Sequence, residues 1–372
     1  MKIIKGNVFF DNNKFEKRDI YIENGIFCEN ESGGGDIFDA EGCYVLPGFI
    51  DIHIHGCTNA DASSGDIGDF EKMSSFLATK GITGFCPTTM TLPIEQLEKA
   101  FIAADKFRQT QVSGSRLLGI NMEGPYFSMA KKGAQNPEYI KNPTIEEFDR
   151  LWKSSNGVIA LADVAPELPG AEKFIKHVSK LTTVSLAHTS ADYSTAKAAL
   201  EAGATNATHL FNAMTPFTHR DPGVPGAVFE SDCCFAELIC DCIHIHPAVI
   251  KTVFKILGDD RVCVISDNIP CAGLPEGKYT SGGLEVYLKD GCAKLADGTL
   301  AGSASLLNTN FKNVAKLVSL ESAIKACSAN PAKNIGVYNK TGSISYGKFG
   351  DVVIIDKNLD IKSVFIAGKL VF

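Results

Sequence analysis

The chain has 372 residues, 45% of them hydrophobic, and its 36 basic and 43 acidic residues give a formal net charge of −7. It is long enough for one large α/β domain with a smaller one, and no Lys/Arg-rich run suggests a nucleic-acid surface or a membrane anchor. The N-terminus lacks a signal-peptide pattern and no apolar run reaches the roughly 18 residues of a membrane span, so we expect a cytoplasmic protein.

The first elements along the chain are short predicted strands. Residues 1–43 read as strands around turns, one of them a Gly-rich turn at 31–36, and residues 342–372 repeat this pattern with a hairpin signal at Ala367 and Gly368. We therefore expect one small β-sandwich domain built from both termini, 1–43 and 342–372.

Between these segments, apolar runs alternate with amphipathic helical patterns. Eight alternations predict a closed parallel (β/α)₈ barrel of the TIM type, an α/β fold, over residues 44–341. The eight runs lie at 44–56, 81–90, 116–125, 157–167, 183–192, 204–214, 235–246 and 261–270.

The connecting segments carry three further local signals. Thr144 and Glu147 form a capping-box pattern that predicts a helix start. The stretch 215–231 is rich in Pro and Gly, which favours a loop over a helix. A hairpin pattern at 278–298 predicts an insertion after the eighth barrel strand.

Polar residues end most of the eight runs, and barrel enzymes place their chemistry at the carboxyl ends of the strands. Five of the eight histidines of the chain fall there. The residues concerned are, in order, His53, His55, Thr88, Thr89, Glu123, His188, His209, His244 and Asp267.

His53 and His55 are separated by one residue, so on a strand they share one face and could hold one metal ion together. A single histidine at a strand end more often just faces solvent, and the pair alone leaves both interpretations open. The twelve cysteines have no zinc-knuckle spacing and no secretory context, so we expect reduced core residues.

With these residues assembled, the chain resembles the N-acetylglucosamine-6-phosphate deacetylases of the amidohydrolase superfamily. The resemblance extends in order through the whole barrel. The matching stretches are "PGFIDIHIHG", "NMEGPYF", "KKGAQNP", "LAHTSAD", "THLFNAMTP", "HRDPGVPGA", "DCIHIHP", "ISDNIPCAG" and "LADGTLAGSA".

The resemblance implies a divalent metal ion held by Glu123, His188 and His209, with a free coordination position for water. Because the chain keeps His53 and His55, a second ion bridged through Glu123 is expected to be possible. Zinc and iron both suit this ligand set, one or two per subunit. No lysine ends the fourth run, so no carboxylated-lysine bridge is expected.

The resemblance also implies that Asp267 is the general base, which takes a proton from the attacking water and returns it to the departing sugar amine. The alternative is that Asp267 only caps its strand or supports a histidine.

Substrate contacts follow from the same resemblance. Arg220 and His244 are expected to bind a phosphate, with the main chain near Asn212 and Ala213, and Leu300 to lie against the sugar. In relatives the arginine comes from a neighbouring subunit, which implies a homodimer. Gln135 replaces a histidine of many relatives, and its amide still donates hydrogen bonds but carries no charge.

The leading hypothesis is therefore metal-dependent hydrolysis of the acetamide of N-acetylglucosamine 6-phosphate to glucosamine 6-phosphate and acetate. The galacto epimer is a close competitor, since one hydroxyl orientation changes few contacts. A cyclic-amide hydrolase would explain the metal ligands but not Arg220 and His244. A barrel without metal that serves as a scaffold is disfavoured because every expected ligand is present.

Overall fold

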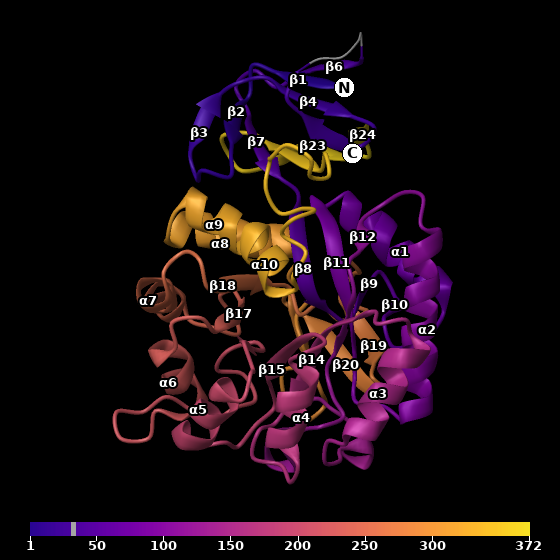
Figure 1. Ribbon diagram of the computed structural model, residues 1–372, viewed down its shortest axis with the longest axis vertical. Coiled ribbons are helices and arrows are strands. Elements are labelled where there is room, and N and C mark those ends of the chain that lie inside the picture. The colour runs from indigo at the N-terminus through magenta and orange to yellow at the C-terminus, as the bar shows by residue number, and fades with distance from the viewer. Residues whose placement is uncertain (31–34) are drawn as a thin grey trace.

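Eight parallel strands of largely buried residues form a barrel in the computed structural model, which describes residues 1–30 and 35–372 (Figure 1). Neighbouring strands pair in chain order, and one parallel bridge between Ile54 and Asn268 nearly closes the ring. The predicted (β/α)₈ fold is thus confirmed. The strands are β8 (Phe49–Ile54), β11 (Ile82–Thr89), β13 (Ile120–Met122), β14 (Ile159–Val164), β15 (Thr183–Leu186), β16 (Asn206–Ala207), β17 (Phe235–Ile239) and β18 (Val262–Ile265).

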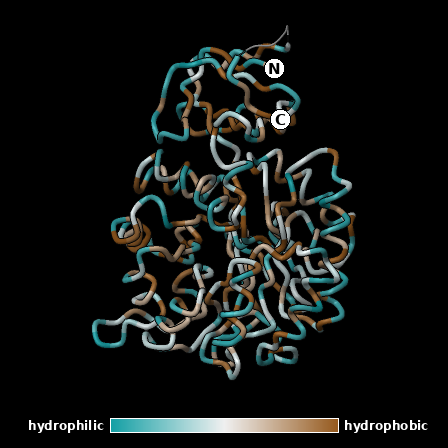
Figure 2. Tube along the Cα trace, viewed as in Figure 1, coloured by the Kyte–Doolittle hydropathy of each residue, from teal (hydrophilic) through white to brown (hydrophobic). Residues whose placement is uncertain are grey.

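Helices cover the outside of the barrel, each with an apolar face turned to the strands (Figure 1). In Figure 2 the apolar residues concentrate along the central strands and the hydrophilic ones in the outer loops. The helices are α1 (Ile67–Ala78), α2 (Ile94–Thr110), α3 (Ile145–Ser154), α4 (Ala171–Val178), α5 (Tyr193–Glu201), α6 (Gly223–Glu230), α7 (Pro247–Leu257), α8 (Leu307–Leu317), α9 (Leu320–Cys327) and α10 (Ala329–Asn334). Within the described residues, no helix combines the length and the apolar character needed to cross a bilayer.

The sixth connection differs from its prediction. Residues 215–231 contain the helix α6 and are not loop throughout. Buried Val224, Ala227 and Val228 anchor this helix, and their packing outweighs the poor helix propensity of the prolines and glycines around them. Helix α3 begins after Thr144 as predicted, but the Thr144 hydroxyl donates to the Glu147 carboxylate and does not cap a backbone N–H.

The two ends of the chain build a second domain of two sheets. One sheet has the order β5-β4-β1-β6 and the other the order β24-β23-β22-β7-β2-β3, and apolar residues of both form a shared core. Their strands are β1 (Lys2–Ile4), β2 (Asn7–Phe9), β3 (Phe15–Lys17), β4 (Ile20–Glu23), β5 (Ile26–Cys28), β6 (Ile37–Asp39), β7 (Tyr44–Pro47), β22 (Val352–Ile355), β23 (Ile361–Ile366) and β24 (Lys369–Leu370). This is the expected β-sandwich, and most of the Gly-rich turn at 31–36 lies outside the described residues.

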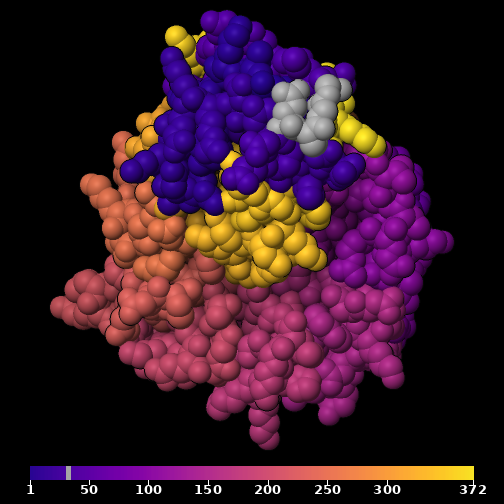
Figure 3. Space-filling model, turned by 45° about the horizontal axis from the view of Figure 1, so that its top comes forward, coloured from indigo at the N-terminus to yellow at the C-terminus, as the bar shows by residue number. Residues whose placement is uncertain are grey.

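Strand β7 belongs to the terminal sheet, where it pairs with β2 and β22. The sequence predicts one barrel strand over 44–56, whereas the structure divides that run between β7 and β8. Because β8 follows β7 directly, the terminal domain sits at the amino ends of the barrel strands. Figure 3 shows the first and last segments of the chain packed together over this end. The opposite end is left free for a site.

Other short elements lie near the strand ends or at the edge of the barrel. The predicted hairpin insertion is a three-stranded antiparallel sheet after β18, and the hairpin at Ala367 and Gly368 joins β23 to β24 through two residues of positive φ. The remaining elements are β9 (Gly56–Cys57), β10 (Ala60–Asp61), β12 (Arg116–Leu117), β19 (Gly277–Ser281), β20 (Leu284–Lys289), β21 (Cys292–Lys294) and the 3₁₀ turns Met129–Lys131 and Pro137–Tyr139.

Candidate metal centre

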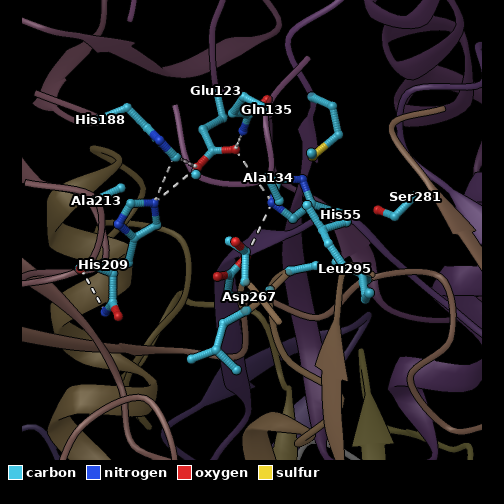
Figure 4. Close-up of a pocket in the computed structure, with 18 of the residues that line it drawn as sticks. His55, Glu123, Ala134, Gln135, His188, His209, Ala213, Asp267, Ser281 and Leu295 are labelled. Atoms are coloured by element: carbon cyan, nitrogen blue, oxygen red, sulfur yellow. Dashed lines mark hydrogen bonds and ion pairs between the residues drawn. The ribbon is translucent and has the colours of Figure 1, made fainter. Parts of the chain in front are cut away.

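A cavity of about 360 Å³ opens at the carboxyl ends of the barrel strands. Its floor carries strand-end residues and its wall includes the inserted sheet, through Ser281 and Val286, and the loop around Leu300. Figure 4 shows His55, Glu123, His188, His209 and Asp267 converging on it. The free end of the barrel is therefore a pocket lined by imidazoles and carboxylates.

Two groups of three possible ligands share one carboxylate in this cavity. His53, His55 and Glu123 form one group, and Glu123, His188 and His209 form the other. Within each group the ligand atoms lie within 4.8 Å of one another, and all five residues are buried. The structure thus brings together every metal ligand expected from the sequence.

The group formed by Glu123, His188 and His209 is the tighter one. Glu123 Oε1 lies 3.2 Å from His188 Nε2 and 3.1 Å from His209 Nε2, and the two ring nitrogens are 3.3 Å apart. In the other group, Glu123 Oε1 lies 3.5 Å from His53 Nε2, and Oε2 lies 3.5 Å from His55 Nε2. Glu123 therefore presents an oxygen to each histidine pair.

Three of the four histidines have their second ring nitrogen engaged by an acceptor. His53 Nδ1 contacts Glu237 Oε2 at 2.9 Å, His55 Nδ1 the Thr88 carbonyl at 3.1 Å, and His188 Nδ1 the Lys131 carbonyl at 2.9 Å. A neutral imidazole that donates from Nδ1 carries its lone pair on Nε2, which is the form that binds metals. All three Nε2 atoms point towards Glu123.

This arrangement fits a divalent cation. Lone pairs of several imidazoles facing a carboxylate repel one another unless a positive charge lies between them, and His53 Nε2 is buried without a hydrogen-bond partner among the described residues. Burial raises the pKa of Glu123, but the surrounding imidazoles of His188, His209, His55 and His53 lower it by more, so the pKa lies well below its usual range. Glu123 is therefore ionised, and its negative charge is balanced either by protonated histidines beside it or by a metal ion.

The backbone at the site is strained. His188, His209 and Asp267 adopt φ values of +44°, +30° and +49°, in the left-handed region that residues other than glycine seldom occupy. Such conformations cost of order 1–3 kcal/mol each and concentrate at functional sites. Their occurrence at three strand ends that face one cavity supports a functional role for this end.

Asp267 lies on the His53 and His55 side of the cavity. Its Oδ1 is 3.2 Å from His55 Nε2 and 3.6 Å from His53 Nε2. Burial raises its pKa, but the hydrogen bond from His55 and the charges of the nearby histidines lower it by more. A carboxylate at this place is within reach of a water bound between the ligands.

Gln135 makes contacts that its residue type alone does not predict. Its amide nitrogen donates to Glu123 Oε2, and its amide oxygen accepts from the Thr91 N–H at 2.7 Å. The side chain is buried and also lines the cavity, close to Glu123 in Figure 4. The structure thus ties Gln135 to the shared carboxylate, and a contact with sugar stays a prediction.

Besides Gln135, four predicted substrate residues line the cavity: Asn212, Ala213, His244 and Leu300. His244 Nδ1 lies 2.7 Å from Asp241 Oδ2. Burial lowers the pKa of His244, but this hydrogen bond and the charges of Asp241 and Asp267 together raise it by more. A cationic imidazole is thereby favoured at the cavity wall, as an anion site requires.

Arg220 does not line the cavity of its own chain. It is exposed on the loop between β16 and α6, so its predicted role depends on a second subunit and stays a prediction. The histidines without a predicted role have ordinary environments: His177 contacts Asp149, His219 is exposed, and His246 caps α7 through the Ala248 N–H as expected. All twelve cysteines are free thiols, and all lie among the described residues.

The sequence prediction missed the acidic residues below the site. Asp51, Asp163 and Glu237 are fully or almost fully buried within barrel strands. Burial is the largest cause raising the pKa of Asp51, to about 6. Their sequence signal was a single carboxylate inside an apolar run, as in "FAELIC", and such a residue is seldom buried without a partner.

The sequence of this chain matches a protein family and several characterised enzymes. The Amidohydrolase family matches residues 44–371, a span that holds both histidine pairs, Glu123 and Asp267. The N-acetylglucosamine-6-phosphate deacetylase of Bacillus subtilis (strain 168) is 35% identical over 334 residues, which cover 88% of this chain and 84% of that protein. The N-acetylgalactosamine-6-phosphate deacetylase of Escherichia coli O157:H7 is 32% identical over 352 residues, covering 94% and 93%.

Solved structures agree with these sequence comparisons. An aspartate-to-alanine variant of the N-acetyl-D-glucosamine-6-phosphate deacetylase of Mycobacterium smegmatis, in complex with N-acetyl-D-glucosamine-6-phosphate, matches with a TM-score of 0.93 at 25% identity. The match covers 100% of this chain and 99% of that chain. The similarity therefore extends through the barrel and the terminal domain alike.

Proposed function

Since this chain belongs to the amidohydrolase family, we propose that it hydrolyses the acetamide of N-acetylglucosamine 6-phosphate, releasing glucosamine 6-phosphate and acetate. The observation that carries the proposal is the pair of ligand groups sharing Glu123 in a barrel similar throughout to deacetylases of this substrate. The chain is thus assigned as a hydrolase of a carbon–nitrogen bond.

The metal content follows from the two ligand groups. We propose one divalent ion at Glu123, His188 and His209, and a second at His53, His55 and Glu123. Zinc or iron is proposed for both, because imidazole and carboxylate ligands suit either ion. A divalent ion held by these residues supplies Lewis-acid polarisation of the acetyl carbonyl and acidifies a water molecule.

Asp267 is proposed as the group that moves the proton. Its carboxylate takes a proton from the water as the oxygen adds to the acetyl carbon, which becomes tetrahedral. The same group then gives the proton to the sugar nitrogen as the carbon–nitrogen bond breaks, so that an amine leaves and acetate remains. Its low pKa keeps it ionised before the reaction.

The phosphate contacts are proposed from the cavity wall. His244 supplies a charged donor, the main chain near Asn212 and Ala213 adds further donors, and Leu300 packs against the sugar. Arg220 is proposed to reach the neighbouring active site of a homodimer, since it is remote from its own cavity. We place the reaction in the cytoplasm, because a sugar phosphate does not cross membranes unaided.

A second candidate substrate is N-acetylgalactosamine 6-phosphate. A protein of that activity in Escherichia coli O157:H7 is 32% identical to this chain, close to the 35% of the Bacillus subtilis glucosamine-type relative. Identity at this level does not separate the epimers. A cyclic-amide substrate is not favoured, since it leaves the anion-binding wall at His244 without a role.

The test combines metal content with kinetics. The purified protein is analysed for bound metal, and kcat/KM is measured for both acetylated sugars with and without the 6-phosphate. We expect bound zinc or iron and a strong preference for the phosphorylated gluco sugar. Equal turnover of the unphosphorylated sugars contradicts the phosphate contacts, and absence of both metal and deacetylation contradicts the assignment.

A further inference from the structure

Glu237 is a buried carboxylate that the proposed reaction does not use. It lies on β17, is 0% exposed, and meets His53 of β8 across the barrel interior. Its Oε2 is 2.9 Å from His53 Nδ1, and its Oε1 accepts a hydrogen bond from Asn206 Nδ2 at 2.8 Å. Both oxygens of Glu237 are therefore occupied by N–H groups.

The orientation of Asn206 is fixed by its other contacts. Its Nδ2 also donates to Ser185 Oγ at 2.9 Å, and its Oδ1 accepts from Asn334 Nδ2 at 3.0 Å. Turning the amide over would set its oxygen against Glu237 Oε1 and its NH₂ group against Asn334 Nδ2, so both of those bonds would be lost. The network thus presents an N–H to Glu237 Oε1, and that oxygen acts as an acceptor.

We propose that Glu237 is a positioning residue that sets the tautomer of His53, and that the second metal site depends on it. A carboxylate only accepts, so the proton of a neutral His53 resides on Nδ1 and the lone pair on Nε2. That Nε2 lies 3.5 Å from Glu123 Oε1 and 3.6 Å from Asp267 Oδ1, in the proposed second site. The inference rests on the proposed function for the presence of metal.

Among the four histidines of the site, His53 is the one whose Nδ1 contacts a side chain, that of Glu237. His55 and His188 donate from Nδ1 to main-chain carbonyls of Thr88 and Lys131, which no substitution removes. His209 Nδ1 has no hydrogen-bond partner among the described residues. A carboxylate partner also makes the imidazole a more basic ligand than a carbonyl partner does. The effect of Glu237 is therefore specific to the His53 and His55 side.

Glu237→Gln reverses the tautomer without changing the size of the side chain. Glutamine has one accepting oxygen and one NH₂ group, and Asn206 requires the oxygen. The NH₂ group then faces His53 Nδ1, which must accept, and the histidine proton moves to Nε2. A protonated Nε2 cannot bind metal.

Asp163→Asn is the matched control. Asp163 is likewise a buried carboxyl group of a barrel strand, on β14, and among the described residues it makes no hydrogen bond with a histidine. This variant exchanges one buried carboxyl group for an amide in the same interior without altering the partner of any histidine. It separates a tautomer effect from a general effect of that exchange or of packing.

The experiment measures metal, not turnover. The intact wild-type protein and both variants are stripped, titrated with zinc, and analysed for zinc per chain by mass spectrometry after gel filtration. We expect two ions in the wild type and in Asp163→Asn, and one tight ion in Glu237→Gln, with the second weakened by about 10- to 100-fold. Equal zinc affinity of Glu237→Gln and the wild type overturns the inference, as does equal loss in both variants.

A measurement on the wild type keeps the inference testable if Glu237→Gln does not fold. Protein labelled with ¹⁵N-histidine and loaded with zinc is expected to show a His53 signal, identified by its loss in His53→Gln, with a proton on Nδ1 and none on Nε2. A proton on Nε2 overturns the inference. If the wild type binds only one ion and still deacetylates the sugar, the inference about Glu237 is overturned and the proposed function stands. If it binds no ion and has no activity, the proposed function is overturned as well.

Discussion

The histidine pair at the end of β8 and the pair that follows β15 and β16 reach Glu123 by different routes. His53 lies in β8 and His55 follows its last residue, so the alternation of an extended chain is enough to put them together. His188 and His209 lie 21 residues apart, and both need left-handed backbone to face the cavity. One pair is placed by secondary structure and the other by the tertiary fold.

The two pairs also differ in backbone strain and in their distances from Glu123. Neither His53 nor His55 has a positive φ, whereas His188 and His209 both have one and carry its cost in backbone strain. The strained pair also makes the shorter contacts with Glu123, at 3.1 and 3.2 Å against 3.5 Å. We expect that pair to be the more sensitive to substitution.

Removal of Glu123 is expected to have the largest effect, because both pairs share it. In Glu123→Ala each of the two proposed ions would lose a ligand and the charge between the pairs would disappear, so we expect neither ion to be retained. We expect kcat/KM to fall by at least about 10⁴-fold, since water activation and carbonyl polarisation are both lost. Metal analysis beside the deacetylation assay checks this, and retention of one ion would show that the pairs are independent.

Asp267→Asn is expected to come next, with the ligands intact and the proton carrier gone. The proposed ions would keep all their protein ligands, while kcat is expected to fall by about 10²- to 10⁴-fold. Calorimetric binding of substrate and metal analysis serve as controls for an intact site. Near-normal turnover in this variant rules out the base assignment.

Single substitutions in the two pairs test the comparison directly. His188→Gln and His55→Gln are each expected to remove one ion per chain, because each ion keeps too few ligands. We expect the loss of kcat/KM to be at least about tenfold larger for His188→Gln, since the tighter group is proposed to hold the primary ion. Equal losses would show that both ions contribute alike to the rate.

Arg220→Ala addresses a residue that neither pair contacts. If the arginine reaches a neighbouring cavity, KM for the phosphorylated sugar rises by about 10- to 100-fold with little change in kcat, as expected for a charge-assisted hydrogen bond. Kinetics with the unphosphorylated sugar, which lacks the contact, provide the control. A normal KM places Arg220 outside the binding site.

The pH dependence of KM is the smallest expected effect. The pKa of His244 is raised, so the cation persists at a pH where an ordinary histidine is neutral, and is lost as the pH rises through the raised value. Above about pH 7 the sugar phosphate is already a dianion, so its charge stays constant. We expect KM to rise about fivefold on the alkaline side, and His244→Gln to abolish the rise.

Repeated local patterns were enough to predict the barrel, whereas the metal ligands were implied by the resemblance to a known family. Apolar runs with polar ends identify strands and their carboxyl ends, and parallel strands bring those ends together whatever the details of packing. His53 and Glu123 could therefore be placed at one end of the barrel without coordinates. Their role as metal ligands came from the resemblance and stays a proposal.

Other features depended on packing that no local pattern carries. The helix α6 exists because Val224, Ala227 and Val228 are buried, against the propensity of the residues around them. The amide of Gln135 and the carboxylate of Glu237 contact histidines or Glu123 from other strands and loops, so their partners are known only once the barrel is assembled. The division of 44–56 into two strands likewise reflects a partner near the other end of the chain.

The pairing of β7 with β22 has a consequence for folding during synthesis. Strand β7 ends at Pro47, and β22, with which it pairs, begins at Val352. The ribosome therefore synthesises about 300 residues before β7 gains this neighbour, and until then one edge of a strand with three buried residues in the native fold stays exposed. Chaperones that shield such edges would be expected to engage the nascent chain at this strand.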